Sequence, residues 1–135
     1  MLKVKTYLDK SILIPQAGLG LFAEEDILSG TIIWVFENSL DLSFSKKTYD
    51  NFYGITKDFL DTYSYKESGE YILCSDNGRF INHSKKFCNT IDLPYKTIAS
   101  RDIKKGEEIF SDYSKFSQDE NDNKHNLNDI PESEL

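Results

Sequence analysis

The chain has 135 residues with a net charge of −7 at pH 7, and 39% of its residues are hydrophobic. This length indicates a single domain with a modest core, and no apolar run approaches the roughly 18 residues of a membrane helix. Because the first ten residues lack the apolar core of a signal peptide, we expect an intracellular protein that is neither secreted nor bound to a membrane.

Most of the net charge lies at the C-terminal end. Residues 118–135 carry six acidic residues and one lysine, which leaves −2 for residues 1–117. A polar, acidic stretch without aromatic residues is typical of a solvated extension, so we expect a folded domain over 1–117 and an acidic tail over 118–135. The remaining surface is not basic enough to indicate direct nucleic-acid binding. Cys74 and Cys88 lack the spacing of a zinc site, so we expect free thiols and no metal.

The N-terminal part predicts a strand followed by a glycine turn. Residues 2–8 (LKVKTYL) have the composition of a strand. Residues 18–23 (GLGLFA) then satisfy the G-x-G-x-x-G/A pattern of a dinucleotide fold. Their context excludes that fold, because Pro15 interrupts the preceding strand and too few residues follow for a crossover helix. We interpret Gly18 and Gly20 as a turn where backbone closely approaches a ligand or another strand, with an ordinary β-turn as the alternative.

The middle of the chain changes from strand to helical patterning. Residues 31–37 (TIIWVFE) predict a strand because they are β-branched and aromatic. Ser45 and Thr56 are then candidate N-caps of two short helices, each with aromatic or leucine residues three or four positions apart. We therefore expect a helical insert over about residues 45–64 in a mainly β chain.

The last third returns to strand patterning and repeats a short sequence pattern from the first third. Residues 70–74, 89–93 and 95–101 predict strands. The pattern D-I-x-x-G-x-x-I occurs at residues 26–33 and again at 102–109. Aspartate before a turn and glycine within it favour a tight bend, so each copy predicts a turn that leads into a strand. Two copies are too few for a repeat array, so we expect two similar β-units that flank the helical insert.

Residues 76–84 (DNGRFINHS) have the groups that recognise an amino-acid head group. Arg79 offers a charged fork for a carboxylate, and Asn82 offers both a donor and an acceptor. A tight Asx or Ser/Thr turn that satisfies its own backbone is the alternative for Asn82, His83 and Ser84.

Residues 106–113 (GEEIFSDY) form the third motif. On its own, Tyr113 would usually be a core residue with a buried ring and a hydroxyl that reaches water. At a reaction centre, a phenol can also hold the reacting atoms in line. We interpret Glu107 and Glu108 as surface or structural carboxylates without an acid–base role.

Together and in this order, the glycine segment, RFINHS and GEEIFSDY resemble the SET domain of protein lysine methyltransferases, over roughly Leu8 to Phe116. The compactness resembles the small stand-alone SET proteins of viruses and bacteria. The resemblance implies a β-clip fold, mainly β with short helices, with small curled sheets and a C-terminal pseudoknot. It also implies S-adenosyl-L-methionine as cofactor, and a lysine of a protein or peptide that enters a narrow channel from the opposite face.

The resemblance assigns roles by position, with Tyr113 as the catalytic tyrosine. The residues that it places at S-adenosylmethionine are Gly18, Leu19, Gly20, Leu21, Arg79, Phe80, Asn82, His83 and Phe116. For Phe116, simple packing is the alternative. Ser111 stands where relatives often carry Phe or Tyr, so the sequence leaves the number of methyl groups open.

Substrate and assembly follow only broadly from the resemblance. A histone tail is the commonest target in the family, and would make the protein nuclear instead of cytoplasmic. A homodimer is compatible with the small relatives. The alternative from another class of function is a SET-like protein-binding module with weak catalysis.

Overall fold

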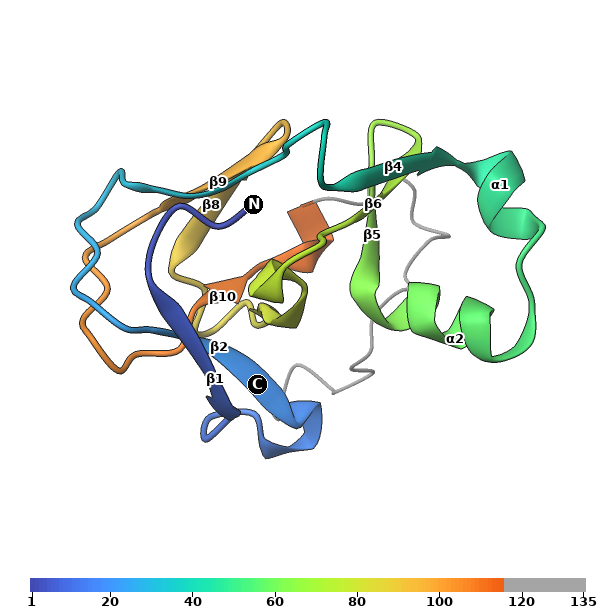
Figure 1. Ribbon diagram of the computed structural model, residues 1–135. Helices are drawn as coiled ribbons and strands as arrows, with labels where there is room; N and C mark the ends of the chain where they lie inside the picture. The colour runs from blue at the N-terminus through green and yellow to red at the C-terminus, as the bar shows by residue number, and fades with distance from the viewer. Residues whose placement is uncertain (116–135) are drawn as a thin grey trace.

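The structure is a computed structural model that describes residues 1–115. Within these residues, short strands form four small sheets, and the two helices lie at one end of the molecule beside the β4–β6–β5 sheet (Figure 1). This architecture confirms the expected mainly β domain with short helices. The proposed tail over 118–135 and Phe116 lie outside the described residues. No helix in the described part is long and apolar enough to cross a membrane.

The elements are short throughout. In chain order the strands are β1 (Thr6–Lys10), β2 (Leu19–Ala23), β3 (Ile32–Val35), β4 (Leu42–Ser45), β5 (Ser64–Glu67), β6 (Glu70–Leu73), β7 (Asn82–His83), β8 (Thr90–Leu93), β9 (Lys96–Ala99) and β10 (Phe110–Ser111). The α-helices are α1 (Lys46–Asp50) and α2 (Gly54–Tyr63), and the 3-10 turns are η1 (Pro15–Ala17), η2 (Asn77–Phe80) and η3 (Tyr113–Lys115). The sheets are antiparallel β1–β2, β3–β9–β8 and β4–β6–β5, and the parallel pair β7–β10.

Each of the five runs that predict a strand overlaps one, but the sequence did not predict β2, β4, β5 or β7. The interpretation of both glycines as a turn is wrong for Gly20, which lies inside β2, paired with Asp9 of β1. Only Gly18 has the left-handed backbone of a turn, with φ of 77° at the end of η1. No crossover helix follows, so the exclusion of a dinucleotide fold holds.

Both expected helices are present, but only one of the two caps is right. The Ser45 hydroxyl accepts a hydrogen bond from the Thr48 amide at 3.1 Å and caps α1. Thr56 does not cap α2, because this helix already begins at Gly54, and the Lys57 amide donates to the Tyr53 carbonyl at 3.5 Å.

The two D-I-x-x-G-x-x-I copies pair with each other. Ile27 and Ile103 form an antiparallel bridge in which both amides donate to the opposite carbonyl at 2.7 Å. The carboxylate of Asp26 accepts from the Lys105 amide at 2.9 Å, and that of Asp102 accepts from the Ser29 amide at 2.8 Å. Each aspartate therefore stabilises the turn of the other copy, which the sequence pattern did not reveal.

The main hydrophobic core includes both residues of this bridge. Its buried members come from β2, β3, β9, the two D-I copies and the motif loops: Leu21, Ala23, Ile27, Ile33, Ile81, Ala99, Ile103 and Ile109. Each buried isoleucine or leucine contributes about 1.5–3 kcal/mol relative to exposure. The loops that carry the candidate site are thus anchored by apolar burial.

The GEEIFSDY segment, residues 106–113, is hydrogen-bonded on two sides. On one side the Ile109 amide donates to the Leu21 carbonyl of β2 at 2.8 Å. On the other, β10 pairs in parallel with β7, and the Ser84 amide donates to the Ser111 carbonyl at 2.9 Å. The RFINHS and GEEIFSDY motifs therefore lie side by side, while the pseudoknot itself stays a prediction.

Asp41 connects the N-terminus to the segment before η2. Its side chain is fully buried and accepts from the Met1 ammonium at 2.8 Å, the Glu37 amide at 2.9 Å and the Ser75 amide at 3.0 Å. Burial alone would raise the pKa of this carboxyl, but the hydrogen bonds outweigh it and hold the pKa below its ordinary value.

We expect Asp41→Asn to lower the free energy of unfolding by about 1.5–3 kcal/mol at pH 7, the range for hydrogen bonds to a charged group. A lowered native pKa contributes stability above the unfolded pKa of about 3.9 and loses it as the pH falls through the native pKa. The difference between the two proteins should therefore shrink below about pH 4. Denaturant unfolding at pH 7, 5 and 3 measures it, and the exposed Asp50→Asn variant, which breaks a surface pair with Lys46, is the control. A loss that is the same at every pH would contradict this account.

Candidate functional site

The RFINHS loop is held in place by Asp76 at its start. One carboxylate oxygen of Asp76 accepts from the Gly78 amide at 3.0 Å and caps η2, and the other accepts from the Leu2 amide at 2.7 Å. The loop then enters β7, where Asn82 and His83 are buried. The local sequence thus forms a short turn that presents two polar side chains inside the molecule.

The amide group of Asn82 has a fixed orientation. Its Nδ2 donates to the Leu19 carbonyl at 3.0 Å and to Glu108 Oε2 at 3.1 Å. The Leu19 carbonyl can only accept, so the nitrogen must face it. Both N–H groups are used, and Oδ1 is the atom that remains to accept a hydrogen bond from a ligand.

Glu108 is buried, with 6% of its surface exposed. Burial raises the pKa of this carboxyl, and hydrogen bonds with Ser11 and Asn82 act in the opposite direction. Its Oε1 is buried without a hydrogen-bond partner in the described part of the chain. Of the two alternatives for Glu108, a surface position is therefore wrong and a structural carboxylate agrees with the burial, but the sequence did not indicate its contact with Asn82. Strand alternation was the available signal, because Ile109 points into the core and its neighbour must point to the other face.

The two glycines of the N-terminal segment are required for different reasons. A Cβ atom at Gly20 would lie 2.4 Å from Glu108 Oε2, closer than real atoms approach. Nothing lies within 4 Å of a Cβ at Gly18, where the positive φ of 77° is the constraint. The glycine at position 20 thus makes room for the Glu108 carboxylate.

Arg79 lies against three aromatic rings, of which the sequence assigned only Phe80 to the site. Its guanidinium carbon is 5.6 Å from the ring centre of Phe80 and 5.8 Å from those of Phe59 and Tyr63 on α2. Such distances are typical of cation–π contacts. The Arg79 Nε is buried and has no hydrogen-bond partner within residues 1–115. This arrangement suits an anionic ligand group that takes the unused donor.

His83 connects the RFINHS loop to Tyr113. Its Nδ1 accepts the Tyr113 amide proton at 2.8 Å, so the imidazole is neutral with its proton on Nε2. The Asp112 carboxylate lies 3.9 Å from the same nitrogen. The hydrogen bond fixes the backbone from which the Tyr113 side chain starts.

Tyr113 lies at the start of η3, immediately after β10. Its hydroxyl donates to the Ile81 carbonyl, and its ring centre is 5.2 Å from that of His83. Burial raises the pKa of the phenol, so the group stays protonated at neutral pH. Tyr113 is thus held close to the loop that carries Asn82.

The structure brings four of the predicted site residues together by hydrogen bonds. Leu19, Asn82, His83 and Tyr113 are joined by the hydrogen bonds described above. The side chain of Leu21 instead packs into the core, and its carbonyl is taken by Ile109. Phe116 lies outside the described residues. Ser111, which replaces the Phe or Tyr of relatives, is buried with its hydroxyl 3.3 Å from that of Thr90.

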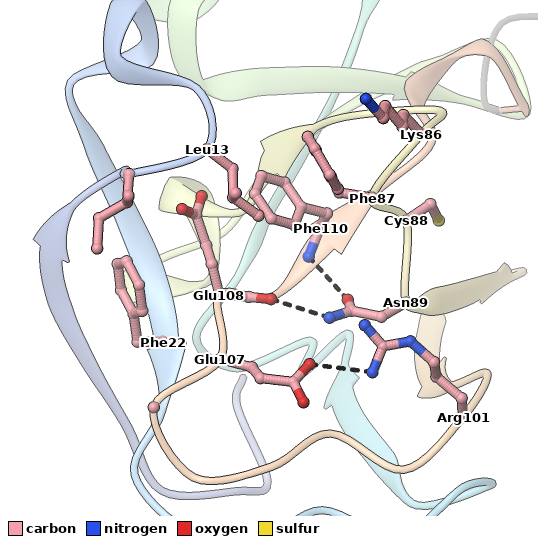
Figure 2. Close-up of a pocket in the computed structure, with 12 residues that line it drawn as sticks. Leu13, Phe22, Lys86, Phe87, Cys88, Asn89, Arg101, Glu107, Glu108 and Phe110 are labelled. Atoms are coloured by element: carbon pink, nitrogen blue, oxygen red, sulfur yellow. Dashed lines mark hydrogen bonds and ion pairs between the residues drawn. The ribbon is translucent and has the colours of Figure 1, made fainter.

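A pocket of about 340 Å³ is lined in part by Glu108. Figure 2 shows that the Glu108 side chain extends toward the part of the pocket with Phe22 and Leu13, away from Asn89 and Arg101. None of the residues predicted for the cofactor site lines it. Within residues 1–115, no group of three or more His, Cys, Asp or Glu residues could hold a metal ion.

Comparison with known proteins identifies the family. Residues 18–114 match the SET domain, so the chain belongs to the SET-domain family. No curated protein sequence matches the chain. Among solved structures, a candidate histone methyltransferase of Plasmodium falciparum is similar in fold, with 24% identity and a TM-score of 0.56 over 83% of this chain and 95% of that chain.

Larger assemblies also contain this fold. The Chaetomium thermophilum polycomb repressive complex 2 matches with 26% identity and a TM-score of 0.57, over 82% of this chain. An inhibitor-bound humanized mutant of that complex matches with 25% identity and a TM-score of 0.60, over 86% of this chain. The present chain spans only 15% and 16% of those two chains.

Proposed function

We propose that the protein is a protein lysine N-methyltransferase that uses S-adenosyl-L-methionine. The observation that carries the proposal is the hydrogen-bonded series from Leu19 through Asn82 and from His83 to Tyr113. This series links the segments of all three motifs, which are far apart in the sequence. Membership of the SET-domain family supports the same activity.

The side chains fit the amino-acid end of S-adenosylmethionine. The buried Nε of Arg79 lacks a partner among the described residues and suits the carboxylate. The Oδ1 of Asn82 suits the ammonium, because both Asn82 N–H groups are already used. When bound, S-adenosylmethionine supplies a methyl group on a positively charged sulfur. Arg79 and Asn82 then orient the molecule from its polar end.

Tyr113 is proposed to hold the substrate amine in line with the reacting methyl group. Its proton is directed at the Ile81 carbonyl, so toward a substrate amine the phenol oxygen would act as a hydrogen-bond acceptor. Because burial raises the pKa of the phenol, Tyr113 is not a general base at neutral pH. Its contribution is alignment, and in-line transfer requires reacting atoms about 3–3.5 Å apart.

The substrate lysine can lose its proton without a dedicated base. At pH 7 a lysine with the reference pKa of about 10.4 requires roughly 4.6 kcal/mol to become neutral. Burial in a dry channel lowers a lysine pKa by up to about 3 to 5, and a neighbouring positive charge lowers it further because like charges repel. These two effects together cover the cost.

We further propose a lysine in a basic peptide, such as a histone tail, as the substrate. The chain is acidic as a whole, with −5 of its net charge of −7 in residues 118–135, and an acidic chain favours a basic partner. Solved structures of similar fold include a candidate histone methyltransferase of Plasmodium falciparum.

Two measurements, one after the other, test the proposal. Calorimetry determines whether S-adenosylmethionine binds, and transfer of a radiolabelled methyl group to histone and other protein panels determines whether catalysis follows. Binding together with labelled lysine is the expected result. Cofactor binding without transfer to any protein would favour a protein-binding module, and absence of binding would refute the proposal.

Tyr113→Phe is expected to lower turnover about 100-fold or more, because a small misplacement of the reacting groups has an effect of that size. Affinity for S-adenosylmethionine should change by no more than a few-fold. Single-turnover transfer and calorimetry measure the two quantities. Tyr7→Phe, which removes a hydroxyl from a half-exposed ring stacked on Phe22, is the matched control. Full activity in the Tyr113 variant would refute its assignment.

Arg79→Ala is expected to weaken binding of S-adenosylmethionine by about 1.5–3 kcal/mol, the range for a charged hydrogen bond. Calorimetry at fixed salt measures the dissociation constant. Arg101→Ala serves as the control, because Arg101 is about half exposed and pairs with Glu107 at 3.0 Å. Equal dissociation constants for the Arg79 variant and the wild type would remove Arg79 from the site.

A further inference from the structure

Glu108 is a buried acidic residue that the proposed mechanism does not use. It reaches from the GEEIFSDY segment into the space beside β2 (Figure 2). The absence of a side chain at Gly20 leaves room for it there. Asn82 donates to Glu108 Oε2 and Ser11 also hydrogen-bonds to this carboxyl, while Oε1 has no partner within the described residues. A buried carboxylate is costly unless it is fully hydrogen-bonded, and Glu108 is only partly so, so its position next to Asn82 requires an explanation.

We propose that Glu108 is a positioning residue, which locks the Asn82 amide so that Oδ1 faces the ammonium of the bound amino-acid head group. The inference rests on the proposed function, because it concerns how that site recognises its cofactor.

The geometry explains why two acceptors are needed. A single hydrogen bond to the Leu19 carbonyl would leave the Asn82 amide free to swing about that contact. The second bond, to Glu108 Oε2 at 3.1 Å, defines the plane of the amide and therefore the direction of Oδ1. When a mobile side chain becomes ordered on binding, the loss of its conformational freedom costs free energy. An acceptor that is already oriented avoids this cost.

Gly20 provides independent support for this role. Its Cβ position would lie 2.4 Å from Oε2 and 2.7 Å from the carboxyl carbon of Glu108. An alanine at this position would therefore push the carboxylate away from Asn82 without changing Glu108 itself. The hydrogen bond between Asn82 and Glu108 can therefore be broken by a substitution at either Glu108 or Gly20.

Four variants test the inference: Glu108→Ala, Glu108→Gln, Gly20→Ala and the double variant of Gly20→Ala with Glu108→Ala. Calorimetry gives the dissociation constant for S-adenosylmethionine, and turnover is measured at saturating cofactor. Side-chain amide signals of Asn82 in nitrogen-15 NMR spectra report its hydrogen bonds without any assay of activity. Thermal unfolding of each variant monitors the folded state.

We expect Glu108→Ala to weaken cofactor binding about tenfold, the equivalent of one hydrogen bond to a charged group. Turnover at saturating cofactor should stay within about threefold, because the reacting centre keeps its Tyr113. Glu108→Gln keeps an acceptor of the same size and should bind within about threefold of wild type. The Asn82 amide protons should exchange faster with water in the alanine variant.

Gly20→Ala should weaken binding about as much as Glu108→Ala. In the Glu108→Ala background, Gly20→Ala should weaken binding no further, because the Glu108 carboxylate with which its Cβ would clash is absent. This non-additivity is the signature that separates a specific interaction from a general loss of structure.

The outcomes separate this inference from the proposed function. If the wild type binds S-adenosylmethionine and Glu108→Ala binds it equally well, the inference is wrong and the function stands. If the variants only lower the unfolding temperature while dissociation constants and Asn82 signals stay unchanged, Glu108 has a purely structural role and the inference is also overturned. If the wild type does not bind the cofactor, the proposed function fails, and the NMR result alone decides whether Glu108 orients Asn82.

Discussion

The backbone of residues 106–113 is hydrogen-bonded along both edges, and the rest of the site depends on this arrangement. Its first half continues the β1–β2 sheet through the bond from the Ile109 amide to the Leu21 carbonyl, and its second half pairs with β7. One rigid segment therefore sets the positions of Glu108 and Tyr113 relative to Asn82. A loop fixed on only one side would let these groups move apart in some conformations. Even a small misplacement of reacting groups lowers the rate of catalysis strongly.

The same segment is surrounded by polar side chains that are buried and paired. Asn89 is 1% exposed, accepts from the Phe110 amide at 2.9 Å and donates to the Glu108 carbonyl at 2.9 Å (Figure 2). Thr90 donates to the Phe110 carbonyl at 2.9 Å. Such networks are strong when complete and costly when one member is missing, because the interior screens charges poorly. The polar groups specify one arrangement of the motifs, while the isoleucines beneath supply most of the burial.

The sequence was informative where the signal is local and weak where tertiary contacts decide. The β-branched runs around Ile33 and Ile98 contain strands, and Ser45 caps α1. By contrast, β4 and β5 have ordinary polar compositions and become strands only because β6 lies between them. In the site, the motifs located Asn82 and Tyr113. They did not reveal why position 20 is a glycine, because the Glu108 carboxylate that fills this space comes from the other end of the domain.

The bridge between Ile27 and Ile103 joins parts of the chain that are synthesised at very different times. During translation, β2 and β7 leave the ribosome well before residues 106–113 are available to pair with them. Their backbone edges are then open to other chains, which is the usual origin of aggregation. Both strands are short, five and two residues, and short edges recruit partners poorly. In this topology the site can form only after residues 106–113 have been synthesised, and the brevity of the unpaired strands limits the backbone edge exposed until then.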